Sequence, residues 1–179
     1  MKKYQIIYAD PPWEYSGNAV IAQKSLINNT EDSHYMPMSL KGIKDLNVNN
    51  ITDDNALLFL WATSPRLPFA IETIISWGFQ YSTVGFVWNK EMTNPGFYTL
   101  SSCEICLIGK KGKIPTPRGA RNIRQFLSEK RTEHSKKPDE IRNQIVKMFP
   151  TQKKIELFAR QKTEGWDTWG NEVDNDITL

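Results

Sequence analysis

Residues 9–13 read Ala-Asp-Pro-Pro-Trp and directly follow an apolar run, YQIIY, at residues 4–8. Two consecutive prolines hold φ at about −65° and lack backbone N–H groups, so a strand has to end there. A residue that precedes a proline is held in an extended conformation, and this restrains Asp10. The segment therefore fixes a carboxylate, the carbonyl of Pro11 and the indole of Trp13 at the end of a predicted strand.

These groups suit a substrate that carries an exocyclic amine, such as a nucleobase. The lone pair of such an amine is delocalised into the ring, while its two N–H groups are donors. Asp10 and the Pro11 carbonyl can accept both hydrogen bonds and make the nitrogen more nucleophilic. Trp13 offers a flat face for a base that has left its stack. The alternative is a rigid Pro11-Pro12 loop whose tryptophan closes the core, and the tetrapeptide alone leaves both open.

Alternating apolar strands and amphipathic helices must position this segment. Strands are predicted at residues 4–9, 56–62, 79–90, 102–110, 121–129, 154–159 and 165–171, and helices at 39–46, 64–78 and 137–149. This alternation indicates an α/β three-layer sandwich with a mainly parallel sheet. Ligands of such sheets bind at the carboxyl ends of the strands, where Asp10, Asn89 and Arg160 fall.

Local signals set the predicted helix ends. Ser39 is a suitable N-cap for the first helix. Ser64 could cap the second helix, which Gly78 would end. Pro138 opens the third. Residues 14–38 form a long polar segment without a sustained period, and long loops in compact domains are usually functional or disordered.

The chain of 179 residues fits one domain, residues 1–179, with a sizeable core. An apolar content of 39% is ordinary for a globular protein. No stretch approaches the roughly 18 apolar residues of a membrane helix. Asp10 interrupts the first apolar run, so the start of the chain is not a signal peptide. These features predict a cytoplasmic protein.

The two cysteines, Cys103 and Cys106, lie in a predicted strand. Residues three apart on a strand face opposite sides of the sheet, which disfavours a disulfide or a shared metal ion. The chain holds two histidines and no second pair of closely spaced cysteines. We therefore expect structural thiols and no metal site.

Positive charge is concentrated in one part of the chain. Residues 110–162 contain 16 Lys and Arg against 5 Asp and Glu, a local charge of +11, although the whole chain carries +3. Such a segment suits a surface that meets phosphates. A solvated face with scattered counter-charges is the alternative, and charge alone does not decide between them.

Eight segments, in this order, resemble the MT-A70 family of adenine N6-methyltransferases, which use S-adenosylmethionine as methyl donor. The resemblance spans nearly the whole chain. The segments are ADPPW at 9–13, HYMPMS at 34–39, ALLFLWAT at 56–63, WGFQYSTVGFVWNK at 77–90, CEICLIGKKG at 103–112, HSKKPDEI at 134–141, KIELFAR at 154–160 and GWDTWGNE at 165–172.

The resemblance implies a Rossmann-like methyltransferase fold in which the catalytic Asp-Pro-Pro-Trp motif precedes the cofactor strand. Asp10, Pro11, Pro12 and Trp13 would form the clamp on the target amine, and methyl transfer would be direct, without a covalent intermediate or a metal. Tyr35 would cover the base or the methyl donor.

The resemblance also implies a set of residues that bind the methyl donor, Asp10 among them. Lys137 would pair with the carboxylate of the methionine moiety, while Arg160, Asn171 and Glu172 would surround its ribose and adenine. Without the family, Lys137 reads as a solvated lysine at a helix start, and Asn171 reads as a turn residue.

The basic stretch at residues 115–131 could line a substrate groove in which Arg118, Arg121 and Arg124 meet phosphates. Family members act on DNA or on RNA, and the small lone domain favours DNA. The alternatives are an RNA adenine N6-methyltransferase, or a non-catalytic partner subunit that binds nucleic acid. The intact clamp with Lys137 and Asn171 favours an enzyme, acting as a homodimer or with a partner subunit.

Overall fold

The computed structural model describes residues 2–14, 37–95, 98–132 and 136–179. In this part of the chain, seven strands form one sheet in the order β5-β3-β4-β2-β1-β6-β7. The strands are β1 Tyr4–Ala9, β2 Thr52–Thr63, β3 Gln80–Asn94, β4 Ser101–Lys111, β5 Phe126–Ser128, β6 Lys154–Leu157 and β7 Asp167–Trp169. β4 runs antiparallel to β2 and β3, whereas the other neighbours are parallel. The predicted mainly parallel α/β sheet is confirmed.

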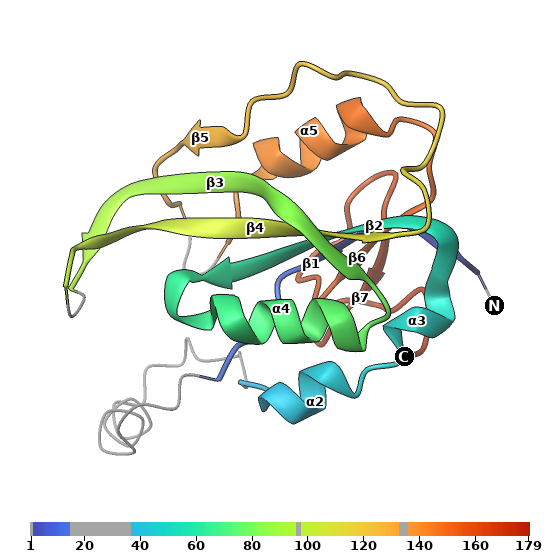
Figure 1. Ribbon diagram of the computed structural model, residues 1–179, viewed down its shortest axis with the longest axis horizontal. Helices are drawn as coiled ribbons and strands as arrows, with labels where there is room; N and C mark the ends of the chain where they lie inside the picture. Colours follow the sequence, from blue (N-terminus) through green and yellow to red (C-terminus); the bar gives the residue numbers. More distant parts are fainter. Residues whose placement is uncertain (1, 15–36, 96–97, 133–135) are drawn as a thin grey trace.

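Helices cover both faces of the sheet (Figure 1). The helical segments are α2 Leu40–Lys44, α3 Val48–Ile51, the 3-10 turn η1 Ser64–Arg66, α4 Leu67–Ser76 and α5 Asp139–Met148. α5 lies on one face, while α2, α3 and α4 lie on the other (Figure 1). The layers are therefore helix, sheet and helix.

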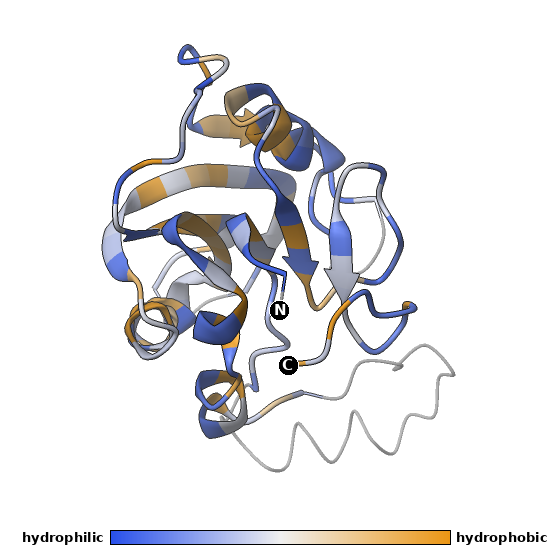
Figure 2. Ribbon diagram, turned by 90° about the vertical axis from the view of Figure 1, so that its right-hand side faces the viewer, coloured by the Kyte–Doolittle hydropathy of each residue, from blue (hydrophilic) through white to orange (hydrophobic). Residues whose placement is uncertain are grey.

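β2 is buried on both faces, as its continuous apolar run predicts. Leu58 and Leu60 join the core cluster that contains residues of α2, α3 and α4. Phe59 and Trp61 join the second cluster, which contains residues of α5. This alternation follows the two-residue period of a strand. Figure 2 shows the resulting concentration of hydrophobic residues on the central strands and the flanking helices.

The predicted helix at residues 64–78 is divided in two. A 3-10 turn occupies Ser64–Arg66, and α4 begins only at Leu67. Pro65 and Pro68 lack backbone N–H groups, so a single α-helix that ran through both residues would lose hydrogen bonds. The prediction of Ser64 as the cap is wrong, because the N-cap of α4 is Arg66 and no side chain caps it. Gly78 follows the helix at a φ of 84°, as predicted for its stop.

The other helix signals are confirmed. The Ser39 hydroxyl accepts a hydrogen bond of 3.1 Å from the Gly42 N–H and caps α2. Pro138 is the N-cap of α5, whose buried Ile141 and Ile145 face the sheet. The predicted strand at 121–129 is shorter than expected, since only Phe126–Ser128 pairs with β3.

Cys106 is buried in the core and Cys103 is partly exposed, and both are free thiols. Among the described residues, no group of three or more potential metal ligands gathers. No helix in the described ranges is long and apolar enough to cross a bilayer.

Gly170 lets the ends of β6 and β7 approach closely. The Ala159 N–H donates to the carbonyl of Trp169 at 3.0 Å. A Cβ atom on Gly170 would lie 2.1 Å from the carbonyl oxygen of Ala159, which is backbone and cannot move aside. The residues that follow these two strands are therefore held together by the absence of a side chain.

Gly170→Ala should lower the free energy of unfolding by about 1–3 kcal/mol, as overpacked sites do. Gly165→Ala is the matched control, because Gly165 has a φ of 78° but nothing lies within 4 Å of its added Cβ. That control should cost only the strain of the backbone, about 1 kcal/mol. Urea unfolding of both variants measures the difference. A smaller loss at Gly170 than at Gly165 would contradict the close approach.

Candidate active site

The segment after β1 forms a tight turn at the carboxyl edge of the sheet. The N–H of Trp13 donates to the carbonyl of Pro11 at 2.9 Å, and the N–H of Met38 donates to the carbonyl of Pro12 at 2.9 Å. A carbonyl oxygen has two lone pairs, so the Pro11 oxygen retains capacity for one more donor. The turn thus fixes Asp10 relative to the sheet.

Trp13 packs into the core. Its side chain is only 8% exposed, and its indole N–H donates to the carbonyl of Trp61 at 2.9 Å. These contacts match the alternative in which the tryptophan closes the core. Stacking of Trp13 on a base stays a prediction.

Asp10 takes part in a chain of four charged side chains, which we call the four-charge chain. Asp10 Oδ2 lies 2.7 Å from Lys137 Nζ, and this ammonium also lies 3.2 Å from Glu104 Oε2. The other oxygen of Glu104 lies 3.3 Å from Lys90 Nζ. The chain holds two cations and two anions, so it is neutral overall while each charge is largely removed from water.

Different elements supply the members of the four-charge chain. Lys137 directly precedes Pro138 and α5, and its Nζ lies 5.7 Å from the centre of the Trp61 ring. Glu104 is set within the sheet, because β4 pairs it with Thr63 on β2 and with Trp88 on β3. The site is therefore built where β1, β3, β4 and α5 meet.

Burial and charge act in opposite directions on these groups. Burial raises the pKa of Asp10, although Lys137 opposes it. Burial also acts to raise the pKa of Glu104, but Lys137 and Lys90 outweigh it and hold that pKa low. Burial acts to lower the pKa of Lys137, but Asp10 and Glu104 outweigh it and raise that pKa. Lys137 is thus cationic. Of its two carboxyl partners, Asp10 has an anionic form that is less strongly stabilised than that of Glu104.

The predicted donor-binding residues lie at the same edge. Arg160 follows β6, and its Nε lies 3.7 Å from Glu172 Oε1. Burial raises the pKa of Asp10, and the charge of Arg160 is the smallest of the effects that oppose this rise. Asn171 and Glu172 are exposed beside it. The structure therefore brings Asp10, Lys137, Arg160 and Glu172 to one edge, while their binding roles stay predictions.

The predicted substrate-binding residues are more scattered. Tyr35 lies outside the described residues. The guanidinium of Arg118 lies over the ring of Phe149, 5.5 Å from its centre, at the far end of α5 from Lys137. Ten helical residues separate these ends, which is about 15 Å. Arg121 and Arg124 are exposed in the segment before β5. Contact of these arginines with phosphates stays a prediction.

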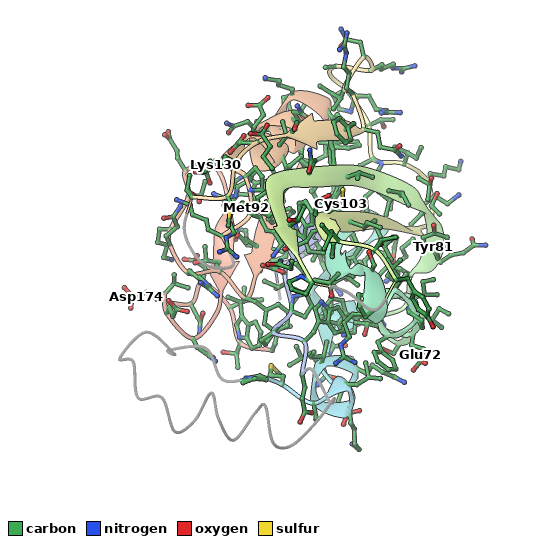
Figure 3. All side chains as sticks on the ribbon, turned by 90° about the vertical axis from the view of Figure 1, so that its left-hand side faces the viewer. Glu72, Tyr81, Met92, Cys103, Lys130 and Asp174 are labelled. Atoms are coloured by element: carbon green, nitrogen blue, oxygen red, sulfur yellow. The ribbon has the colours of Figure 1, made fainter. Side chains whose placement is uncertain are left out.

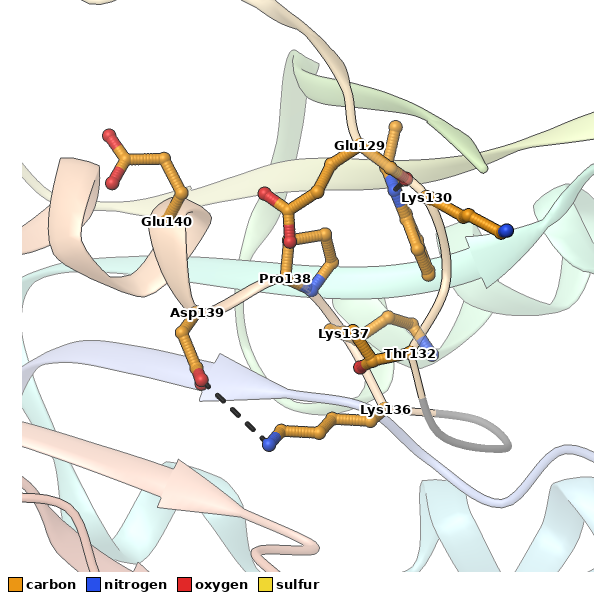
Figure 4. A pocket seen from close by; sticks show the side chains of 9 residues that line it. Glu129, Lys130, Thr132, Lys136, Lys137, Pro138, Asp139 and Glu140 are labelled. Atoms are coloured by element: carbon orange, nitrogen blue, oxygen red, sulfur yellow. Dashed lines mark hydrogen bonds and ion pairs between the residues drawn. The ribbon is translucent and has the colours of Figure 1, made fainter. Parts of the chain in front are cut away.

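A polar cavity of about 150 Å³ adjoins Lys137 (Figure 4). Trp88 forms one wall of the cavity. A second wall holds the ion pair of Lys136 and Asp139, whose Nζ and Oδ2 atoms lie 3.9 Å apart. The remaining lining residues are Glu129, Lys130, Thr132, Lys137, Pro138 and Glu140. The cavity joins the site to the basic segment that follows β5.

The sequence-based reasoning missed Glu104, Lys90 and Glu156. Each has the same signal, namely a charged residue in or at the end of an otherwise apolar strand. Burying a charge is costly unless it is paired, so such a position indicates a partner. The sequence alone does not say which partner that is.

Glu156 is a third carboxyl, beneath the site that holds Asp10 and Glu104. It lies beside Tyr8 in the pairing of β6 with β1, and its Oε2 lies 3.2 Å from Arg142 Nε. Burial raises the pKa of Glu156 to about 7, with Asp10 and Asp139 adding to the rise and Arg142 opposing it. Glu156 therefore titrates near neutral pH in the folded protein.

Comparison with known proteins identifies a family. The MT-A70 family profile matches residues 4–172. The type II methyltransferase M.MunI of Mycoplasma sp is 47% identical over 99% of this chain and 82% of that protein.

Two further relatives are longer. The catalytic subunit METTL3 of the Homo sapiens N(6)-adenosine-methyltransferase is 27% identical over 96% of this chain. The N(6)-adenosine-methyltransferase MT-A70-like protein of Arabidopsis thaliana is 29% identical over 95% of it. The matched region is 28% and 24% of these two proteins, so the chain spans about a quarter of each.

The raised pKa of Glu156 predicts a pH dependence of stability. Between about pH 4.5 and pH 7 the folded protein retains a proton that the unfolded chain has released. Stability falls with rising pH wherever the folded state binds more protons. Glu156→Gln should remove this fall, so wild type should lose stability relative to the variant from pH 5 to pH 7.5. Urea unfolding at several pH values measures it, and parallel curves would contradict the shift.

Proposed function

This chain belongs to the MT-A70 family, and we propose that it transfers a methyl group to the N6 amine of adenine in DNA. The 47% identity with a type II methyltransferase, over nearly the whole chain, carries the choice of DNA. That relative is a DNA methyltransferase. The N(6)-adenosine-methyltransferases, whose names indicate an RNA nucleoside, are less similar to this chain. RNA is therefore the second candidate, which the first assay below distinguishes.

We propose a Rossmann-like methyltransferase fold in which the Asp-Pro-Pro-Trp motif precedes the strand that binds the cofactor. Residues 1–179 would act as one catalytic domain in the cytoplasm. The position of Asp10 at the carboxyl end of β1, near the centre of the sheet, supports this arrangement. The enzyme would act as a homodimer or with a partner subunit.

The target amine would be held by two acceptors. Asp10 and the free lone pair of the Pro11 carbonyl would each accept one N–H of the adenine amine. Both hydrogen bonds favour a pyramidal nitrogen with a more available lone pair. Of the two acceptors, only the carboxylate of Asp10 can take up the proton that the nitrogen loses after transfer, and burial raises the pKa of Asp10. This carboxyl is therefore suited to accept it.

The residues at this edge also fit S-adenosylmethionine as methyl donor. This molecule carries a carboxylate, an ammonium group and ribose hydroxyls, and its sulfonium supplies an electrophilic methyl group. Lys137 is a cation with little exposure, suited to the carboxylate, and Glu172 offers oxygens that ribose hydroxyls can reach. Arg160 and Asn171 would complete the pocket.

Lys137 would then change partner during binding. Lys137 contacts two carboxylates, Asp10 and Glu104. The anionic form of Asp10 is the less strongly stabilised of the two, because Glu104 is also paired with Lys90. When Lys137 binds the carboxylate of the methionine moiety, an oxygen of Asp10 becomes available to the target amine. Glu104 would keep Lys137 in place throughout.

The first test is transfer of labelled methyl from S-adenosylmethionine to matched DNA and RNA, with mass analysis of the nucleosides. We expect N6-methyladenine in DNA. N6-methyladenine in RNA alone would replace DNA by RNA as substrate. Binding of the donor without transfer to either would point to a missing partner subunit. Neither transfer nor binding would support a non-catalytic partner.

Asp10→Ala should reduce the turnover rate at least about a hundredfold, because it removes a preorganised acceptor. Its melting temperature should stay close to that of wild type, because Glu104 remains as a partner of the Lys137 ammonium. Asp45→Ala is the control, as this exposed carboxyl pairs with Lys41 away from the site. Full turnover in Asp10→Ala would exclude the clamp.

Lys137→Ala should weaken donor binding about tenfold or more, the value of a hydrogen bond between charged groups. Calorimetric titration with S-adenosylmethionine measures this Kd. Lys136→Ala is a matched control, because Lys136 is the preceding lysine and pairs with Asp139 instead. If Lys137→Ala binds the donor as wild type does, the assignment of Lys137 is wrong.

A further inference from the structure

β3 and β4 extend beyond the rest of the sheet at the edge that holds the four-charge chain. The last pairing of β3 with β5 is at Asn89, and the last pairing of β4 with β2 is at Glu104. Residues 90–94 of β3 and 101–103 of β4 therefore form a two-stranded extension without a third described strand. We call this extension, together with the adjoining non-strand residues 95 and 98–100, the ribbon. Figure 1 shows β3 and β4 continuing past the end of β5.

The ribbon turns away from the plane of the sheet at its base. The register of β3 against β4 is irregular between Asn89 and Asn94. Glu91 has a φ of 53°, in the left-handed region that few residues adopt. Such irregularities bend a strand and increase its twist. The ribbon is thus directed outward, while Lys90 and Glu104 at its base stay in the four-charge chain.

The ribbon exposes three large apolar side chains. Tyr98 is 100% exposed, Leu100 66% and Met92 41%. They make up three of the seven large apolar side chains that the described surface exposes. Exposed apolar groups gathered in one place indicate a contact surface.

Basic residues lie beside the ribbon. The N–H of Arg131 donates to the carbonyl of Lys90 at 3.3 Å, and Lys130 precedes it. In Figure 3 Lys130 and Met92 are labelled on one side of the view and Tyr81 on the other. Cations beside a protruding apolar tip match the phosphates and stacked bases of a nucleic acid.

The dimensions also fit duplex DNA. A two-stranded ribbon can enter the major groove. Tyr98 is six residues from Glu104, so the chain reaches at most about 20 Å from the site. That distance spans about six base-pair steps, so the tip can reach the base pair that is being opened.

We propose that the ribbon inserts Tyr98 into duplex DNA and fills the space left by the adenine that enters the site, with Leu100 and Met92 supporting it. This rests on the proposed function, because an enzyme that modifies a base in a duplex has to extrude that base. An aromatic ring in the gap recovers part of the lost stacking.

A second copy of the chain is the other possible partner of the ribbon, but the surface is small for it. The ribbon offers 12 described residues. A stable interface usually needs about 20–30 residues a side.

The test uses the full chain and synthetic duplexes around an adenine that the first assay has shown to be methylated. One duplex carries thymine opposite that adenine, and the other carries an abasic residue there. Tyr98→Ala should transfer methyl to the paired duplex about tenfold more slowly than wild type, the value of one lost stacking contact. On the abasic duplex the two proteins should differ less than about twofold, because the adenine is already unpaired.

Two controls separate the inference from other causes. Tyr81→Ala removes an exposed tyrosine at the other end of β3 and should match wild type on both duplexes. Tyr98→Phe keeps the ring and should also match wild type. Sedimentation of wild type and Tyr98→Ala shows whether the ribbon joins two copies.

Several outcomes would overturn the proposal. They are equal rates for Tyr98→Ala and wild type on the paired duplex, the same defect on both duplexes, and conversion of a wild-type dimer into a monomer by Tyr98→Ala. If wild type methylates no DNA at all, the proposed function fails first, and the insertion of Tyr98 fails with it.

Discussion

The ion pair between Asp10 and Lys137 joins the first strand of the sheet to the start of α5. Its atoms come from residues 127 positions apart in the sequence. A pair with so little exposure is costly unless each charge has further partners. Glu104 meets this need for Lys137, and Lys90 does so for Glu104. The antiparallel β4, which inserts Glu104 between β2 and β3, is therefore as necessary to the site as the proline turn.

Much of the fold could be predicted because its signals are local. The burial of β2 follows from an unbroken apolar run, and the start of α5 follows from Pro138. The division of the helix after Ser64 could be inferred only in part. Whether two prolines end one helix or separate two depends on what the segment packs against. The antiparallel direction of β4 is also a tertiary property that no local pattern in residues 101–111 reveals.

The site was predictable in its residues but not in its connections. Asp10 and Lys137 follow from the sequence, but their direct contact does not, because residues so far apart give no spacing signal. Trp13 shows the opposite limit. Its type suggested a stacking surface, which stays a prediction, while the structure shows a buried side chain whose indole N–H donates to the Trp61 carbonyl. Residue type indicates what a side chain is able to do, and packing decides what remains accessible.

The two halves of the four-charge chain have unequal structural support. Lys90 and Glu104 lie on neighbouring strands, while Asp10 and Lys137 lie just outside regular elements. Local opening in proteins begins where few ladder hydrogen bonds hold the backbone. In a fluctuation that loosens the start of α5, Lys137 would leave with that segment, and the sheet would retain a neutral Lys90–Glu104 pair. The sheet would then survive the transient loss of the Asp10–Lys137 pair without an uncompensated glutamate, and re-formation of the pair would require only the return of one lysine.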